Sequence, residues 1–202
     1  MRVPLVGLTG TIGAGKSTAL EVLQQMGAAV LSTDAVVHEL YGGDEVRAAV
    51  LARWGEGVLD DDGQADRAAI ARVAFADPAE QAWLEQMIWP RVAERVAAFH
   101  ADAAASTPPP PAAVVETPLL FEAGMEALFD ATIAVVAEDA LRRERMSERD
   151  HEAVEAREER QLTQDEKARR ASFVVDNSGS TEMLERQLRE VLDRLPRWLE
   201  GG

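Results

Sequence analysis

The sequence has no cysteine and only three histidines among its 202 residues. Without cysteine, the chain has no disulfide framework, no thiolate metal site and no cysteine nucleophile, which is consistent with a reducing compartment. Three scattered histidines also argue against a zinc site. The sequence therefore excludes the disulfide-rich, zinc-binding and thiol-dependent classes of protein.

Basic residues are scarce as well. Lysine and arginine together number 21 against 36 acidic residues, a formal net charge of −15. The electrostatic field of such a chain repels polyanions, so we expect neither nucleic acid nor an anionic membrane surface as a partner. Any anionic substrate must then be bound by locally clustered arginine and lysine side chains.

Long apolar runs are also missing, and no stretch approaches the span of a bilayer. Residues 1–10 lead into an apolar strand pattern without a basic leader or a cleavage site, so we expect a cytoplasmic protein. A chain of 202 residues is long enough for one α/β domain with a full core, and too short for two independent domains.

A glycine-rich motif stands directly after the first apolar run, residues 3–8. Residues 10–17 read Gly-Thr-Ile-Gly-Ala-Gly-Lys-Ser and fit the pattern G-x-x-x-x-G-K-[ST]. Glycines allow successive backbone N–H groups to wrap a phosphate at a helix N-terminus, while the lysine reaches the β- and γ-phosphates and the serine ligates Mg²⁺. The predicted nucleotide-binding residues are Gly13, Ala14, Gly15, Lys16, Ser17 and Thr18.

Apolar runs alternate with helical patterns along the chain, which predicts an α/β fold with a parallel sheet covered on both faces. We expect five strands, at residues 3–8, 28–31, 113–117, 131–136 and 173–175. Helices are expected at residues 15–26 and 181–199. The fold class is thus a three-layer arrangement around a five-stranded parallel sheet.

Two further segments have helical patterns of their own. Residues 35–105 carry an apolar stripe at helical spacing and no strand pattern, and the prolines at residues 108–111 then form an exposed spacer. Residues 140–171 are densely charged, which predicts poorly buried helix, either a mobile lid or a solvated helix pair. We expect one domain with a core of residues 1–34, 112–140 and 171–202, a helical acceptor insert at 35–111 and a lid at 141–170.

Several polar residues are placed where phosphoryl transfer would need them. Asp34 follows the second strand, where ligands bind in parallel sheets, and is either a proton acceptor or a helix N-cap. Arg145 and Arg149 lie four residues apart and share a helix face with Arg157, so they could clamp a triphosphate. Glu116 ends the third strand and either organises Mg²⁺ through water or is a plain edge carboxylate.

The phosphate loop alone leaves the reaction open. A GTPase of the common type needs an Asn-Lys-x-Asp guanine reader, which the chain lacks. A motor ATPase would need a larger body and arginine fingers between subunits. A small-molecule kinase needs an acceptor-binding insert, a carboxylate at the acceptor hydroxyl and cationic side chains over the phosphoryl group, and each has a candidate here.

These motifs together resemble the dephospho-CoA kinase family over nearly the whole chain. The shared segments are the loop at residues 7–18, Thr33-Asp34 with Val37-His38, Pro-Leu-Leu-Phe-Glu at 118–122, the arginines of 145–157 with Gln161, and 166–179. The pentapeptide is the sharpest marker. The chain departs from the family pattern at Ser32, where the family usually has aspartate, and at Trp89, where it usually has histidine.

The resemblance implies transfer of the γ-phosphoryl group of ATP to the ribose 3′-hydroxyl of dephospho-CoA, the last step of CoA synthesis. ATP and Mg²⁺ would be the cofactors, dephospho-CoA the acceptor, and no protein partner would be required. Carried over by position, the catalytic residues are Lys16, Asp34 as base and Arg149 on the transferring phosphoryl group. Asn177 would lie against the adenine, and Thr9, Pro118 and Leu119 would join Asp34 on the acceptor side.

Two other functions remain open at this point. One is a small kinase of the same architecture acting on a nucleoside monophosphate or a sugar acid. The other is a non-catalytic ATP sensor that binds a protein partner, with the prolines of residues 108–111 as a docking segment.

Overall fold

A computed structural model describes residues 2–147 and 161–200, in two units. The first unit comprises Met1–Leu31 and Phe99–Gly202, and the second comprises Ser32–Ala98. Among the described residues, no helix is both long enough and apolar enough to cross a membrane.

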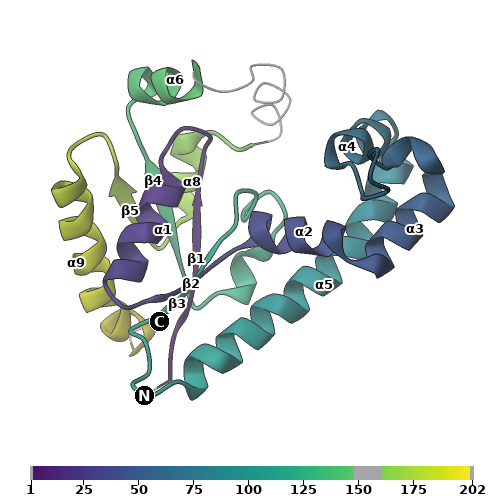
Figure 1. Cartoon of the computed structure of the whole chain (residues 1–202). Helices are drawn as coiled ribbons and strands as arrows, with labels where there is room; N and C mark the ends of the chain where they lie inside the picture. Colours follow the sequence, from purple (N-terminus) through teal and green to yellow (C-terminus); the bar gives the residue numbers. More distant parts are fainter. Residues whose placement is uncertain (1, 148–160, 201–202) are drawn as a thin grey trace. The chain divides into compact units, whose positions relative to one another are not determined.

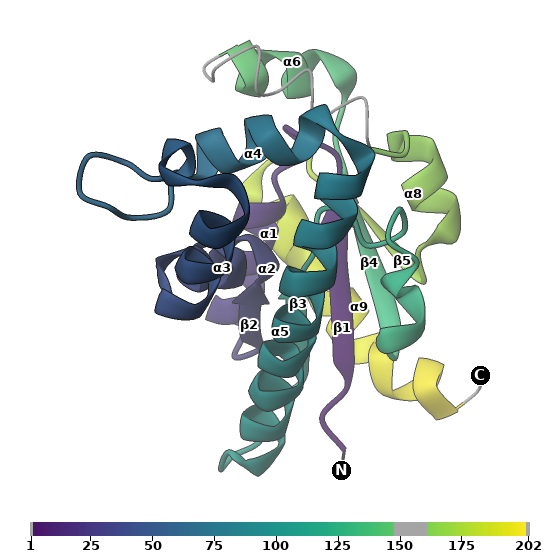
Figure 2. The same ribbon diagram turned by 90° about the vertical axis from the view of Figure 1, so that its right-hand side faces the viewer.

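The first unit is built on a five-stranded sheet (Figure 1). Across the sheet the strand order is β2-β3-β1-β4-β5 (Figure 2). The strands are β1 (Leu5–Gly10), β2 (Ala29–Ser32), β3 (Ala113–Glu116), β4 (Ala131–Val136) and β5 (Phe173–Asp176). The central strand β1 runs parallel to β3 on one side, with Val6 opposite Val114, and parallel to β4 on the other, with Val6 opposite Ala131. The predicted five-stranded parallel sheet is confirmed.

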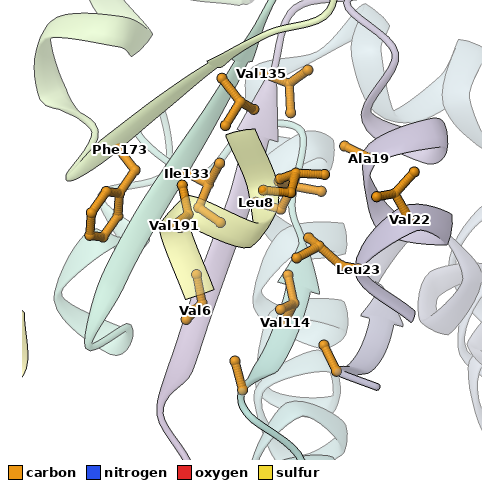
Figure 3. Packing of buried hydrophobic residues seen from close by; sticks show 14 of the residues in the cluster. Val6, Leu8, Ala19, Val22, Leu23, Val114, Ile133, Val135, Phe173 and Val191 are labelled. Carbon is orange, nitrogen blue, oxygen red and sulfur yellow. The ribbon is translucent and has the colours of Figure 1, made fainter. Parts of the chain in front are cut away.

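One face of the sheet packs against α1 (Lys16–Gln25) and α9 (Thr181–Glu200). Val6 and Leu8 point to this face and meet Leu23 of α1 and Val191 of α9 in a single buried cluster (Figure 3). The polar positions of α9 face away from its buried row of Leu184, Leu188, Val191 and Leu195. The amphipathic helix expected at the carboxyl end of the chain is therefore present.

The opposite face of the sheet is covered by α8 (Gln164–Arg170) and by the segment between β3 and β4, which includes the 3₁₀ helix η2 (Met125–Leu128) (Figure 2). Alternate residues of a strand point to opposite faces, so Gly7 and Thr9 face this layer. A Cβ on Gly7 would lie 2.5 Å from Cδ1 of Leu120, which shows how closely the segment after β3 approaches. The three predicted layers are thus present.

The second unit is helical, as the sequence predicts. It contains α2 (Thr33–Gly42), α3 (Asp44–Trp54), the 3₁₀ helix η1 (Glu56–Val58), α4 (Arg67–Ala76) and most of α5 (Pro78–Ala105). The expected apolar stripe is present on α5, where Leu84, Ile88, Val92 and Val96 are buried. α5 runs through Pro90 and continues into the first unit.

The charged segment at 140–171 differs in part from the sequence prediction. Its described portions are α6 (Asp139–Ser147), an irregular stretch at 161–163, and α8. α8 is poorly buried, as expected, except at Lys167, which is 0% exposed. A densely charged helix pattern predicts exposed side chains, and it does not show that one of the cations, Lys167, is buried. Arg149 and Arg157 lie outside the described residues, so their predicted roles stay predictions, as does the division into core, insert and lid.

Candidate active site

The loop between β1 and α1 has the backbone that its glycines predict. Gly13 and Gly15 have φ of +78° and +87°, a region that residues with a side chain rarely adopt. The N–H of Ala14 donates to the carbonyl oxygen of Thr11 at 3.2 Å and tightens the turn. A Cβ on Gly15 would lie 1.9 Å from Nδ2 of Asn177, so this position has no room for a side chain.

The phosphate-binding groups lie at the start of α1, directly after this loop. The first backbone N–H groups of a helix have no partner within it and carry a partial positive charge. Lys16 is the first residue of α1, and its Nζ donates to the carbonyl oxygen of Thr11 at 3.3 Å. Ser17 and Thr18 are exposed beside it. The loop therefore offers backbone amides, one ammonium and two hydroxyls to an anionic ligand.

Two predicted ATP-binding residues from distant parts of the chain meet at this loop. Asn177, which follows β5 and is 6% exposed, donates from Nδ2 to the carbonyl oxygen of Ala14 at 2.9 Å. Arg145 of α6 donates to the carbonyl oxygens of Gly13 at 3.1 Å and of Asn177 at 3.2 Å. Both side chains therefore hold the loop from outside.

Two more side chains, Arg142 and Gln161, hold the loop. The sequence pattern did not identify Arg142, and it assigned no contact to Gln161. Arg142 donates from Nε to the carbonyl oxygen of Ile12 at 3.1 Å, and Oε1 of Gln161 accepts from the N–H of Ile12 at 3.2 Å. Arg142 lies three residues before Arg145, a spacing that places both on one face of α6 and could have identified it. No local pattern marks the contact of Gln161.

The predicted acceptor-side residues of the first unit lie together at the ends of β1 and β3. The hydroxyl of Thr9, which is 0% exposed, donates to the carbonyl oxygen of Pro118 at 3.2 Å. Leu119 follows and is half-buried. Glu116, 8% exposed, pairs in register with Leu8 and so ends β3 at the same edge of the sheet as the phosphate loop.

Asp34 lies in the second unit, in the first turn of α2. The N-cap of this helix is Ser32, so the alternative that Asp34 caps the helix is wrong. The carboxylate is exposed and is free of that structural role. His38, four residues later, lies on the same face of α2.

A contact within the second unit defines the state of His38. Nη1 of Arg67, at the start of α4, lies 3.2 Å from Nδ1 of His38. A guanidinium can only donate, so Nδ1 accepts and the other ring nitrogen, Nε2, carries the hydrogen. Arg67 also lies 6.0 Å from the ring centre of Tyr41, whose pKa is raised by burial and lowered to a smaller degree by Arg67. No sequence pattern predicts that α2 and α4 are in contact here.

Among residues 2–147 and 161–200, no group of three or more histidine, aspartate or glutamate side chains could hold a metal ion. A nucleotide-bound Mg²⁺ does not need one, because it keeps several waters and takes only one or two protein ligands beside the phosphates. The Ser17 hydroxyl and the Glu116 carboxylate are oxygen donors of the kind that Mg²⁺ prefers. The residues present therefore fit the ion.

A glycine loop at the end of the central strand of a parallel sheet, with a lysine and serine opening the next helix, defines a P-loop nucleotide-binding fold. The five-stranded parallel sheet with helices that carries this loop is the fold of the P-loop kinases. Within this class, the chain belongs to the dephospho-CoA kinase family, since a family model of that description matches residues 4–183.

Relatives of known description belong to the same family, and solved structures share the fold. The chain is 42% identical to a dephospho-CoA kinase of Deinococcus radiodurans over 94% of this chain and 91% of that one. It is 38% identical to one from a Synechococcus species over 98% and 94%. The crystal structure of TT1252 from Thermus thermophilus superposes with a TM-score of 0.81 at 34% identity, over 96% and 99% of the chains. A dephospho-CoA kinase from Campylobacter jejuni, at 22% identity and a TM-score of 0.68 over 96% and 97% of the chains, shares the fold.

Proposed function

We propose that the chain transfers the γ-phosphoryl group of ATP to the ribose 3′-hydroxyl of dephospho-CoA, with Mg²⁺ as cofactor. Membership of the dephospho-CoA kinase family makes the chain an enzyme, a kinase of CoA biosynthesis. The observation that carries the proposal is the phosphate loop itself, closed at Gly13 and Gly15 and held by Arg145 and Asn177.

At the donor end, the backbone amides of the loop and the first turn of α1 bind the β- and γ-phosphates. Lys16 moves from the Thr11 carbonyl to these phosphates and neutralises charge as the phosphoryl group transfers. Arg145 lies between the loop and Asn177, so its guanidinium faces the adenosine side of the nucleotide. Ser17, with Glu116 acting through water, would hold Mg²⁺, and the bound ion would supply positive charge that offsets the charge of the phosphates.

At the acceptor end, Asp34 accepts the proton of the 3′-hydroxyl. His38, on the same face of α2 as Asp34, and Arg67, which contacts the His38 ring, are proposed as hydrogen-bond donors to the phosphates of the acceptor. Thr9, Pro118 and Leu119 are the proposed acceptor-binding residues of the first unit. The selectivity for dephospho-CoA over smaller acceptors then resides in the second unit.

Arg149 and Arg157, beyond the end of α6, complete the proposal. Arg149 would contribute its guanidinium to the transferring phosphoryl group, in the manner of an arginine finger supplied by the same chain, and Arg157 would bind the triphosphate of ATP. The cytoplasm is the proposed location, in keeping with a sequence that has no cysteine. ATP and dephospho-CoA are the proposed partners, without nucleic acid, membrane or a second protein.

The test is a comparison of acceptors. Purified protein is given ATP and Mg²⁺, and ADP release is followed with dephospho-CoA, nucleoside monophosphates, gluconate or shikimate. We expect release that depends on dephospho-CoA alone. Release with another acceptor would identify a different small-molecule kinase, and ATP binding without any acceptor-dependent release would identify an ATP sensor. Either result would overturn the proposal.

A further inference from the structure

The chain contains two lysines, Lys16 in the phosphate loop and Lys167 in α8, and the rest of its 21 lysines and arginines are arginine. Arginine presents a planar fork, whereas lysine presents a compact ammonium with three donors. Lys167 is 0% exposed, which is rare for a lysine. The proposed reaction uses Lys16 and assigns nothing to Lys167.

Three oxygen atoms surround the ammonium group of Lys167. Its Nζ lies 2.6 Å from the carbonyl oxygen of Pro118, 2.9 Å from Oε1 of Glu122 and 3.4 Å from Oγ1 of Thr9. The Thr9 hydroxyl gives its own hydrogen to Pro118, so all three oxygens must accept from Nζ. Three N–H donors require the charged form, although burial lowers the pKa of Lys167 more strongly than Glu122 raises it.

Glu122 is the second member of the pair and connects to the start of the α8 region. Its Oε1 also accepts from the N–H of Leu162 at 2.8 Å, while its buried Oε2 has no hydrogen-bond partner within the described part of the chain. A buried ion pair with an oxygen left unpaired is a poor source of stability, because desolvation offsets most of the attraction. Stability alone does not account for the pair.

The position of α8 does not depend on this pair. Thr163 and Glu166 form a reciprocal capping box at the start of the helix. Gln164 exchanges two hydrogen bonds with the backbone of Ala137, at 2.8 and 3.0 Å. These contacts keep α8 on the sheet when Lys167 is changed, so the effect of Lys167 on the site can be separated from its effect on folding.

We propose that Lys167 and Glu122 are a positioning pair for phosphoryl transfer, which fixes the Thr9 hydroxyl and the Pro118 carbonyl at the acceptor side of the phosphate loop. This inference rests on the proposed function, because Thr9 and Pro118 matter only if an acceptor binds there. Thr9 directly precedes Gly10, the last residue of β1, so its hydroxyl lies next to the start of the loop. A displacement of about 1 Å at such a site can lower turnover by about a hundredfold.

The decisive variant is Lys167→Met combined with Glu122→Gln. It removes both charges, leaves no uncompensated ion, and keeps an amide oxygen for the N–H of Leu162. We expect it to fold with a melting temperature within about 5 °C of the wild type, since neutral replacement of a buried pair costs little. We expect its kcat/KM for dephospho-CoA to fall about 10- to 100-fold, while its Kd for ATP changes by less than about threefold.

Two controls define what the result means. Arg170→Met removes an exposed cation from the same helix and should leave both constants unchanged. Thr9→Val tests the route of the effect: if the pair acts through Thr9, adding Thr9→Val to the double variant should lower kcat/KM little further.

A double variant with wild-type kcat/KM would overturn the positioning role, as would full additivity with Thr9→Val. If the double variant does not fold, the pair is structural and the proposal is wrong. Failure of the proposed function would be seen separately, as absence of dephospho-CoA turnover in the wild type and in Arg170→Met.

Discussion

Gly15 shows at the scale of one residue why the phosphate loop has its sequence. Its φ of +87° is costly for any residue with a Cβ, by about 1–2 kcal/mol. The added Cβ would also displace Asn177 from Ala14. We predict that Gly15→Ala raises the Kd for ATP at least about tenfold, the equivalent of 1.4 kcal/mol.

Isothermal titration with ATP measures this effect. Gly57→Ala is the matched control, because a Cβ there meets nothing within 4 Å, and its Kd should equal that of the wild type. Equal affinity in Gly15→Ala would show that the loop can adapt to a side chain.

Asp34, in the second unit, is the proposed base that accepts the proton of the acceptor hydroxyl. Replacing it with asparagine keeps the size of the side chain and removes the proposed proton acceptor, so Asp34→Asn should lower kcat by about 100- to 10,000-fold. ATP binding should not change. ADP release with dephospho-CoA gives kcat, and Asp61→Asn, an exposed acidic residue of the same unit, should behave as wild type. Near-native turnover in Asp34→Asn would remove its assignment as base.

The sequence predicted residues whose role depends on local backbone structure, and it did not predict contacts between residues far apart in the chain. The glycines of the loop were predicted because their backbone angles follow from a short motif. The contacts of Lys167 with Glu122, and of Arg67 with His38, join residues 45 and 29 positions apart, and no periodicity reports such pairings. From the sequence alone, Lys167 in its charged helix is indistinguishable from an exposed cation, because its partners are not known.

At the scale of elements, α6 is joined to the phosphate loop mainly by Arg142 and Arg145. We predict that Arg145→Ala weakens ATP binding about tenfold, because hydrogen bonds from a charged donor contribute roughly 1.5–3 kcal/mol. Titration with ATP gives the Kd. Arg143→Ala, an exposed neighbour on α6, should have no effect, and an equal loss in both variants would point to helix stability as the cause.

Within the second unit, Glu80 joins α3 to α5. Its carboxylate accepts from Nε of Arg53 at 2.6 Å and from Nε1 of Trp54 at 2.6 Å. The hydrogen bond from Arg53, followed by that from Trp54, lowers the pKa of Glu80 below its usual 4.5. The folded state therefore favours the carboxylate, so this stabilisation is present above pH 4.5 and is lost as the pH falls through the lowered pKa.

Glu80→Gln should therefore unfold at a lower urea concentration than the wild type at pH 7, and the difference should shrink below pH 4.5. Tryptophan fluorescence is a suitable probe, because Trp54 packs against Trp83 with ring centres 5.1 Å apart. Glu94→Gln, an exposed site on α5, is the control. A difference that stays constant with pH would exclude the charged pair as its source.

At the scale of the whole molecule, the fold could be predicted because the strand and helix patterns are strong. The five strands were expected within two residues of their observed ends, since buried parallel strands form short apolar runs bounded by turns. The order β2-β3-β1-β4-β5 could not be derived, because pairing depends on contacts between distant segments. A net charge of −15 adds a constraint, since anionic substrates must bind where arginine and lysine gather at the loop.

The most direct test of the account is the position of the phosphate in the product. ATP, Mg²⁺ and dephospho-CoA are incubated with the wild-type protein, and the product is examined by mass spectrometry and ³¹P NMR. We predict one added phosphoryl group, as a monoester on the ribose 3′-oxygen, formed in step with ADP. Phosphate on any other hydroxyl, or no phosphorylated acceptor while ATP is bound, would contradict the account.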